Sequence, residues 1–312
     1  MFRSVVLSSL LLVTAQAAEC PETWVCPFTE TPPTLDADHS EWASVTSFST
    51  SLVDISGNEY TAGKAELKCL HDNSNIYFAL EIPGEYNFDT EDNHLCAAIG
   101  TMFKVGSKAT YINMGGCPDA ATGCDAVPDT CTDYLVDIGA HWELRTTEQG
   151  VMYGMNATSG TGNDLVANKD DEYGVSPMCR FDDDDDTAGN EWSGAWAHSQ
   201  TTIGEMGEYT FELSRSLTTA STKTDAQLAK GGVYKFGIAY WDPNQLATGW
   251  TDAGHYLTGC GSNWVDLVLG ESSKATNGDT DTTAANGEGS SAFQYFSSAF
   301  MALLSVASAL CM

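Results

Sequence analysis

Short runs of β-branched and aromatic residues recur along this chain, separated by Gly, Asn and Asp, and an apolar repeat of helical period is hard to find. Many of the runs alternate in the manner of strands that bury one face. We predict strands over residues 65–69, 75–82, 97–104, 134–144, 209–213, 233–241 and 264–269. Because no helices alternate with them, the pattern predicts an all-β fold, a single antiparallel β-sandwich over about residues 27–270.

Both ends of the chain are apolar. Residues 1–18 combine Arg3, an apolar run and a small-residue exit, which predicts a cleaved secretory signal peptide. Residues 271–291 are almost free of large apolar side chains and predict a flexible stalk. Small residues around Ala285 and Asn286 and a hydrophobic tail over 292–312 follow the pattern of a GPI attachment signal. A transmembrane helix is the alternative, although it would have to include several polar residues.

These signals predict a protein on the extracellular face of the cell membrane, held in the outer leaflet by a lipid anchor. The chain carries 43 acidic against 13 basic residues, a formal net charge of −30. Such a surface repels phosphate backbones, so a nucleic-acid partner is excluded. Cations, cationic proteins or simple solubility at a cell surface are compatible with it.

Ten cysteines in a secreted chain indicate disulfide bonds. One of them, Cys311, would leave with the hydrophobic tail, which leaves an odd number of nine. The cysteines for which we expect bonds are Cys20, Cys26, Cys117, Cys124, Cys131, Cys179 and Cys260. The close spacing of Cys117, Cys124 and Cys131 predicts at least one bridge within that loop. A Cys20–Cys26 bridge is expected as a second, and Cys179 and Cys260 are placed to join strands of the final sheet region.

Two phrases carry a resemblance to a known family. Residues 35–42 read LDADHSEW, and residues 67–82 read LKCLHDNSNIYFALEI, which is a strand, an Asp/Asn turn and an aromatic strand. Together they resemble the DOMON-like sandwiches. These include the haem-binding domain of the ethylbenzene dehydrogenase gamma subunit, the cellobiose dehydrogenase cytochrome and the family 9 carbohydrate-binding modules. The resemblance covers about residues 30–270.

Two further phrases favour the haem-binding branch of this superfamily. Met114 precedes two glycines, where the gamma-subunit-like domains place an axial Met. His255 lies in the phrase over 234–269, about where the relatives carry the second axial ligand. The resemblance therefore implies a haem b bound between Met114 and His255, and the absence of a CxxCH sequence makes its attachment non-covalent. This ligand pair leaves no open coordination position, which suits electron transfer with a redox partner protein.

Simpler interpretations of both ligands remain open. A methionine such as Met114 readily fills an irregular gap in a core. His255 follows Asp252 and Gly254 and could cap a turn. His141 and Lys235 are weaker candidates for the second ligand.

A non-catalytic carbohydrate-binding or adhesion module of the same fold is the competing hypothesis, with an extracellular glycan as partner. Four tryptophans lie in or near expected loops, namely Trp192, Trp196, Trp241 and Trp250. Flat aromatic faces stack on the C–H surface of a sugar ring, so a facing pair of them could hold a glycan.

Three further features complete the prediction. The five aspartates at 182–186 could collect calcium, but consecutive side chains cannot all converge on one ion, so a solvated loop is the simpler interpretation. Asn156 heads an Asn-Ala-Thr sequon and is expected to be glycosylated. No GxSxG, HExxH or phosphate-binding glycine loop occurs, so we expect a binding or electron-transfer module rather than a self-sufficient enzyme.

Overall fold

A computed structural model describes residues 23–54, 57–89, 96–143, 149–150, 153–154, 171–183, 192–244, 255–258 and 264–271. All of these residues belong to one compact unit, Met1–Ser273. The remaining unit, Lys274–Met312, lies outside the described residues, as do the expected signal peptide, Asn156, Trp250 and the expected anchor site at Ala285 and Asn286.

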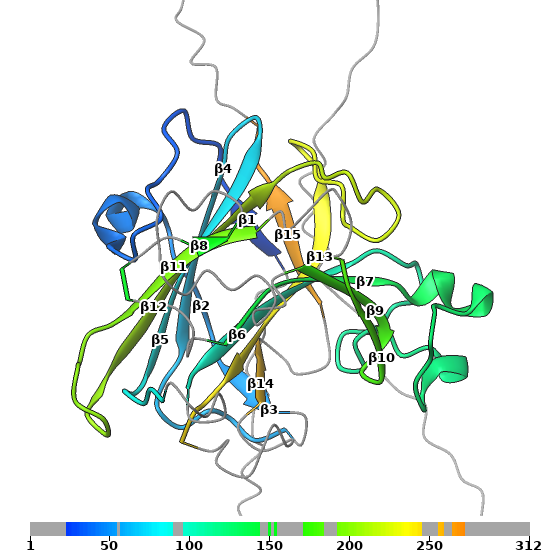
Figure 1. The fold of residues 1–312 in the computed structure, drawn as a ribbon. Coiled ribbons are helices and arrows are strands. Elements are labelled where there is room, and N and C mark those ends of the chain that lie inside the picture. The colour runs from blue at the N-terminus through cyan, green and yellow to red at the C-terminus, as the bar shows by residue number, and fades with distance from the viewer. Residues whose placement is uncertain are drawn as a thin grey trace, which may run out of the picture. The chain divides into compact units, whose positions relative to one another are not determined.

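Two facing sheets form the unit (Figure 1). The nine-stranded sheet contains β1 (Thr23–Cys26), β3 (Leu52–Asp54), β6 (Ala98–Lys104), β7 (Val136–Glu143), β9 (Asp171–Ser176), β10 (Cys179–Asp182), β13 (Val233–Trp241), β14 (His255–Thr258) and β15 (Val265–Leu269). The six-stranded sheet contains β2 (Phe48–Thr50), β4 (Ala65–His71), β5 (Asn75–Glu85), β8 (Tyr153–Gly154), β11 (Trp192–His198) and β12 (Met206–Ser216). The predicted all-β sandwich is confirmed.

Strand direction departs from the prediction at one edge of the sandwich. Strand β1 pairs with β15 in parallel, with Thr23 opposite Asp266 and Cys26 opposite Leu269. The other strand pairs in the described part of the chain are antiparallel. The sheet is therefore mixed, because the last strand of the domain returns beside the first.

The main core lies between the sheets and follows from strand alternation. In β13, Phe236, Ile238 and Tyr240 are buried in this core, whereas the intervening positions face the other side of the sheet. Phe78 of β5 stacks on Phe236 with ring centroids 5.0 Å apart, which joins the two sheets. The outer face of the nine-stranded sheet is not part of this core.

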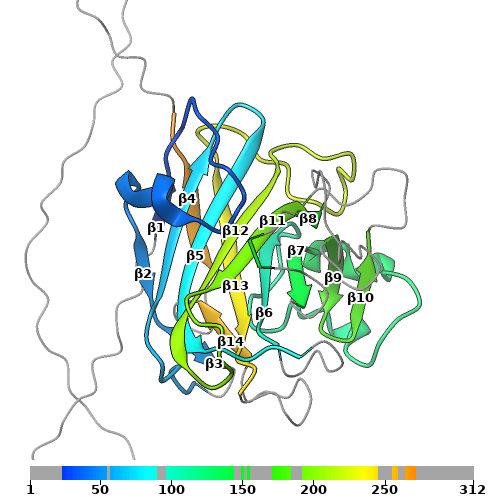
Figure 2. The ribbon, with the colours of Figure 1, turned by 60° about the vertical axis from the view of Figure 1, so that its left-hand side comes forward.

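Short 3₁₀ helices cover the outside of the sandwich. Helix η1 (His39–Ser44) lies against the outer face of β4 and β5 and buries Trp42 on Tyr77 (Figure 2). Helices η3 (Pro118–Ala120) and η4 (Asp129–Tyr134) lie beside β9 and β10 (Figure 1). None of the helices in the described ranges is long and apolar enough to cross a membrane.

Three disulfides stabilise the described part of the chain. Cys117 bonds Cys131, 14 residues away, which confirms a bridge within the cysteine-rich loop. Cys124 bonds Cys179 across 55 residues and ties that loop to β10.

The third disulfide corrects a prediction. Cys26 bonds Cys69 across 43 residues, so the expected Cys20–Cys26 bridge is wrong, because a cysteine forms only one disulfide bond. Strands β1 and β4 are the edge and next-to-edge strands of opposite sheets, and only their packing brings these two sulfurs together. Cys20 and Cys260 lie outside the described residues.

Candidate functional site

The outer face of the nine-stranded sheet carries a second, smaller apolar cluster. It includes Met102 of β6, Ile138 of β7 and Leu257 of β14, with Tyr111 and Met114 from the segment that covers them. Met102 lies between Thr101 and the inward-facing Phe103, so alternation turns it away from the main core. The cluster surrounds a hollow that we call the slot.

Tyr111 anchors the segment that covers the slot. Its side chain is buried, and its hydroxyl lies 3.1 Å from the Ile238 carbonyl and 2.9 Å from the Thr258 hydroxyl. Burial raises the pKa of Tyr111 to about 12. The ring lies directly on Gly237, where an added Cβ would come within 2.2 Å of it, so this strand position requires glycine.

Met114 lies in the left-handed region, with φ of +44°. Reciprocal backbone hydrogen bonds of 3.0 Å between Thr110 and Gly115 close the turn that contains it. Gly115, at φ +104°, lies so close to Tyr134 and Val175 that a Cβ would meet their carbonyl oxygens. A non-glycine residue at positive φ costs about 1–2 kcal/mol, and the surrounding structure has to offset this cost. The close packing of the neighbouring glycines therefore holds the Met114 backbone in this conformation.

His255, which also lines the slot, begins β14 and lies opposite Trp241 of β13. The two rings stack, with centroids 4.5 Å apart and planes inclined by 14°. Trp241 is 9% exposed, and His255 is partly exposed. The indole therefore fixes the plane of the imidazole while leaving it accessible from the slot.

The slot encloses about 180 Å³. It is lined by Gly100, Thr101, Met102, Tyr111, Ile112, Met114, Ile138, Pro177, Arg180, Gly237, Ile238, Ala239, Trp241, His255 and Leu257. The structure thus brings the two predicted ligands, Met114 and His255, to one cavity. Lys235 does not line it: its ammonium group lies 2.6 Å from Asp266 in an ion pair at the surface. The side chain of His141 lies outside the described residues.

The sequence did not identify most of the lining residues, among them Met102, Tyr111 and Arg180. Met102 could have been found, because it alternates with inward-facing neighbours in a predicted strand. Tyr111 and Arg180 carried no such signal, since their positions depend on a loop and on a strand that the sequence pattern did not predict.

The donor atoms that line the slot are suitable ligands for a haem, but the slot has to widen before a haem can enter. A thioether and an imidazole are a pair that occupies both axial positions of haem iron, and the remaining walls are mostly apolar. Pockets for molecules of drug size enclose roughly 300–1,000 Å³. At about 180 Å³ the slot is smaller, so a macrocycle can enter only if the slot widens.

Comparison with known proteins identifies the family of the chain. The family model described as ethylbenzene dehydrogenase matches residues 37–253, more than half of the chain. The chain belongs to the ethylbenzene dehydrogenase family. Domains of the ethylbenzene dehydrogenase family bind haem, and the predicted resemblance is confirmed. No curated protein matches the chain.

Solved structures also resemble this member of the ethylbenzene dehydrogenase family. A family 9 carbohydrate-binding module from Caldicellulosiruptor kristjanssonii in complex with glucose is 11% identical, with a TM-score of 0.36. That comparison covers 82% of this chain and 100% of the module. The same module in complex with cellotriose is 10% identical over 85% of this chain and 100% of its own, with a TM-score of 0.36. Scores this low carry no inference about ligands.

Two of the four tryptophans expected to contact a sugar lie elsewhere. Trp192 and Trp196 are 0% and 1% exposed and belong to the main core, where Trp192 stacks on Phe78. A buried indole presents no face to a glycan, so the structure contradicts that expectation for these two rings. They lie on β11, a strand that the sequence pattern did not predict. Trp241 lines the slot instead.

A buried acidic cluster lies at the side of the sandwich. Ligand oxygens of Asp137, Asp171 and Asp225 all lie within 4.8 Å of one another, so the cluster could hold a metal ion. Arg215 already supplies a positive charge there, with Nη1 donating to Asp137 over 2.6 Å. Burial alone would lower the pKa of Arg215, but the three aspartates raise it. Of the five aspartates at 182–186, Asp183 lies close by, with its amide donating to the Asp171 carbonyl over 3.0 Å.

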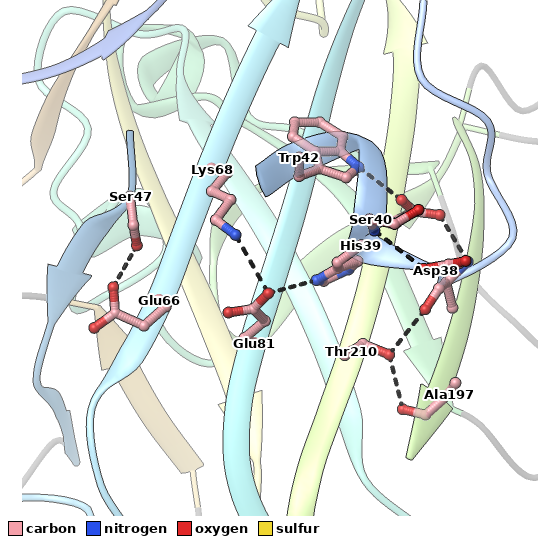
Figure 3. A network of polar contacts seen from close by, with 12 residues as sticks. Asp38, His39, Ser40, Trp42, Ser47, Glu66, Lys68, Glu81, Ala197 and Thr210 are labelled. Carbon is pink, nitrogen blue, oxygen red and sulfur yellow. Dashed lines mark hydrogen bonds and ion pairs between the residues drawn. The ribbon is translucent and has the colours of Figure 1, made fainter. Parts of the chain in front are cut away.

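A polar network covers the outer face of the six-stranded sheet (Figure 3). Glu81 of β5 lies 2.9 Å from Nδ1 of His39 and 3.4 Å from the Lys68 ammonium. Burial would raise the pKa of Glu81, but the His39 hydrogen bond and the Lys68 charge outweigh it and lower that pKa. Glu66 accepts a hydrogen bond from Ser47, which directly precedes the neighbouring strand β2. This network attaches η1 to the sheet.

Proposed function

We propose that this protein is an extracellular haem-binding module that carries electrons, with Met114 and His255 as the axial ligands of a b-type haem. The observation that supports the proposal is that both donors, which are 141 residues apart in a single chain, line one largely apolar slot. Membership of a haem-binding family supports the cofactor.

The residues of the slot have separate parts in this proposal. A haem with both axial positions filled supplies one-electron chemistry and binds no oxygen. Trp241 holds the plane of the His255 ring. The turn at Thr110 and Gly115 aims Met114 at the cavity, and Tyr111 tethers the same segment to β13. The apolar walls exclude water from the bound ring.

We infer the location of the protein and the charge of its partner from the sequence. The predicted signal peptide and the hydrophobic tail support secretion and attachment to the outer leaflet by a lipid anchor. A net charge of −30 favours a cationic redox protein as the partner, since opposite surface charges accelerate encounter.

An optical titration tests the proposal. The purified protein is supplemented with haem, and the reduced and oxidised spectra are recorded for the wild type, Met114→Ala and His255→Ala. Met206→Ala is the matched control for the thioether, because Met206 is 53% exposed and lies on the other sheet. We expect a six-coordinate spectrum in the wild type and in the control, and its loss in each ligand variant.

Two results would overturn the proposal. A wild-type protein that stays colourless has no haem site. Unchanged spectra in both ligand variants would place the iron elsewhere. A colourless protein that binds a glycan array would favour the carbohydrate-binding alternative, with Trp241 as the remaining described candidate for a stacking ring.

A further inference from the structure

The slot has one positively charged wall residue, Arg180, among the described side chains that line it. This charge stands out because the chain has only 13 basic residues against 43 acidic ones, and its surface as a whole repels anions. An anionic group could therefore approach the slot favourably only where a local cation receives it.

Two features of the backbone and one disulfide bond position Arg180. The register between β10 and β9 shifts between Cys179 and Arg180, and such a bulge redirects the side chain at that point. The arginine lies opposite Gly174, where an added Cβ would come within 3.0 Å of Arg180 Cγ, so its stem lies flat across a position without a side chain. The preceding residue, Cys179, is bonded to Cys124.

Among the described residues, most N–H groups of the Arg180 guanidinium have no hydrogen-bond partner. Its polar contact within the described part of the chain is with Glu172, where Nη1 lies 3.4 Å from Oε2. An arginine presents five N–H donors in a planar fork that matches a carboxylate. The Arg180 side chain is 34% exposed, against 1% for Glu172, so it can reach a ligand while still facing its partner.

We propose that Arg180 is the anion anchor of the slot: it binds the carboxylate of an otherwise apolar ligand. The inference rests on the proposed function, in which the ligand is a haem and the carboxylates are its propionates. The cysteine-rich loop then has a part in binding, because its Cys124–Cys179 bond holds the strand that presents Arg180. Arg180 is a binding residue and does not contact the iron in this proposal.

Iron-free protoporphyrin tests the anchor without the axial ligands. Affinities for protoporphyrin IX and for its dimethyl ester, which lacks the negative charges, are compared in the wild type, Arg180→Gln and Arg180→Lys. Lys235→Gln is the matched control, because it removes one positive charge from the same sheet outside the slot. Charge-assisted contacts contribute enough to predict at least tenfold tighter binding of the acid by the wild type.

The expected result is that Arg180→Gln abolishes this preference, Arg180→Lys keeps part of it and Lys235→Gln keeps all of it. If Arg180→Gln binds acid and ester with the wild-type ratio, the anchor is wrong even though the haem proposal stands. That outcome, with a loss of folding stability in the variant, would mean that Arg180 serves only Glu172.

A second probe separates the two proposals if the wild type binds neither porphyrin. The haem function then fails, and anilinonaphthalene sulfonate, an apolar anion, tests the anchor by its fluorescence. Enhancement in the wild type and in Lys235→Gln, with at least a tenfold weaker affinity in Arg180→Gln, supports an anion site for another ligand. Equal fluorescence in all of them overturns the anchor as well.

Discussion

The indole nitrogen of Trp42 donates a buried hydrogen bond of 2.7 Å to Glu212, a carboxylate 170 residues further along the chain. The other oxygen of Glu212 accepts the backbone amides of Asp36 and Ala37 at 2.8 and 2.7 Å. One side chain of β12 thus fastens the whole opening segment, from Asp36 to Trp42, to the six-stranded sheet. Burial raises the pKa of this carboxyl group, although the three donors oppose the rise.

Glu212→Gln should lower the free energy of unfolding by about 1–3 kcal/mol, because an amide nitrogen cannot accept the hydrogen bonds that one carboxylate oxygen receives. Urea unfolding measures the change. Glu205→Gln, at an exposed glutamate in the turn before β12, is the control and should leave stability within about 0.5 kcal/mol. Equal effects of the two substitutions would show that the Glu212 contacts do not hold the opening segment.

Acid should weaken the attachment of η1 through Glu81. A lowered pKa in the folded state means that the contribution of Glu81 is fully present above its unfolded pKa of about 4.3. The contribution is lost as the pH falls through the lower folded value.

Unfolding at pH 7 and pH 3 measures this dependence. We expect Glu81→Gln to be about 1 kcal/mol less stable than the wild type at pH 7 and the gap to be smaller at pH 3. Glu85→Gln, at an exposed position of the same strand, should show no gap at either pH. A gap that stays constant with pH would mean that the lost contribution is not electrostatic.

Arg215 should be hard to remove alone. It is 2% exposed, and its guanidinium lies 5.3 Å from the Phe103 ring centroid and 5.7 Å from that of Trp192. Arg215→Met leaves Asp137 buried without its ion-pair partner, so we expect a loss of about 3–5 kcal/mol in urea unfolding. Adding Asp137→Leu should restore much of it, and a double variant as unstable as the single one would contradict this explanation.

Gly237→Ala tests the packing of the slot cover. The new methyl group would come within 2.2 Å of the Tyr111 ring, and overpacking of this kind costs about 1–3 kcal/mol. Urea unfolding and the melting temperature report the change. Tyr111→Phe is the companion variant, since it removes the hydroxyl contacts but keeps the ring on Gly237. If Gly237→Ala is as stable as the wild type, the ring has room to move, and haem can enter more easily than the closed slot indicates.

The sequence predicted the strands that are determined by local patterns. Alternation and turn residues predicted β4, β5, β6, β7, β12, β13 and β15 and hence the sandwich. The resemblance placed Met114 and His255, and the structure brings both to one slot.

What the sequence missed depends on long-range pairing. Cys26 meets Cys69 only after the sheets have packed, so its nearer neighbour Cys20 misled the prediction. Strand β11 reads WSGAWAH, and Ser193 and His198 are its polar residues. Its burial comes from pairing with β12 along its full length. Arg180 reaches the slot through a bulge that no spacing reveals.

The parallel pairing of β1 with β15 has a consequence for how the protein matures. The first strand of the domain obtains its sheet partner only after residue 269, the end of the last strand, has been synthesised. The β4–β5 hairpin can form early from local contacts, whereas closure of the sheet edge must wait until the whole domain has been synthesised. During that interval Trp24 of β1, which is 3% exposed in the finished fold, is an apolar surface without its cover. We therefore expect chains shortened before β15 to remain bound to chaperones rather than to reach the folded state.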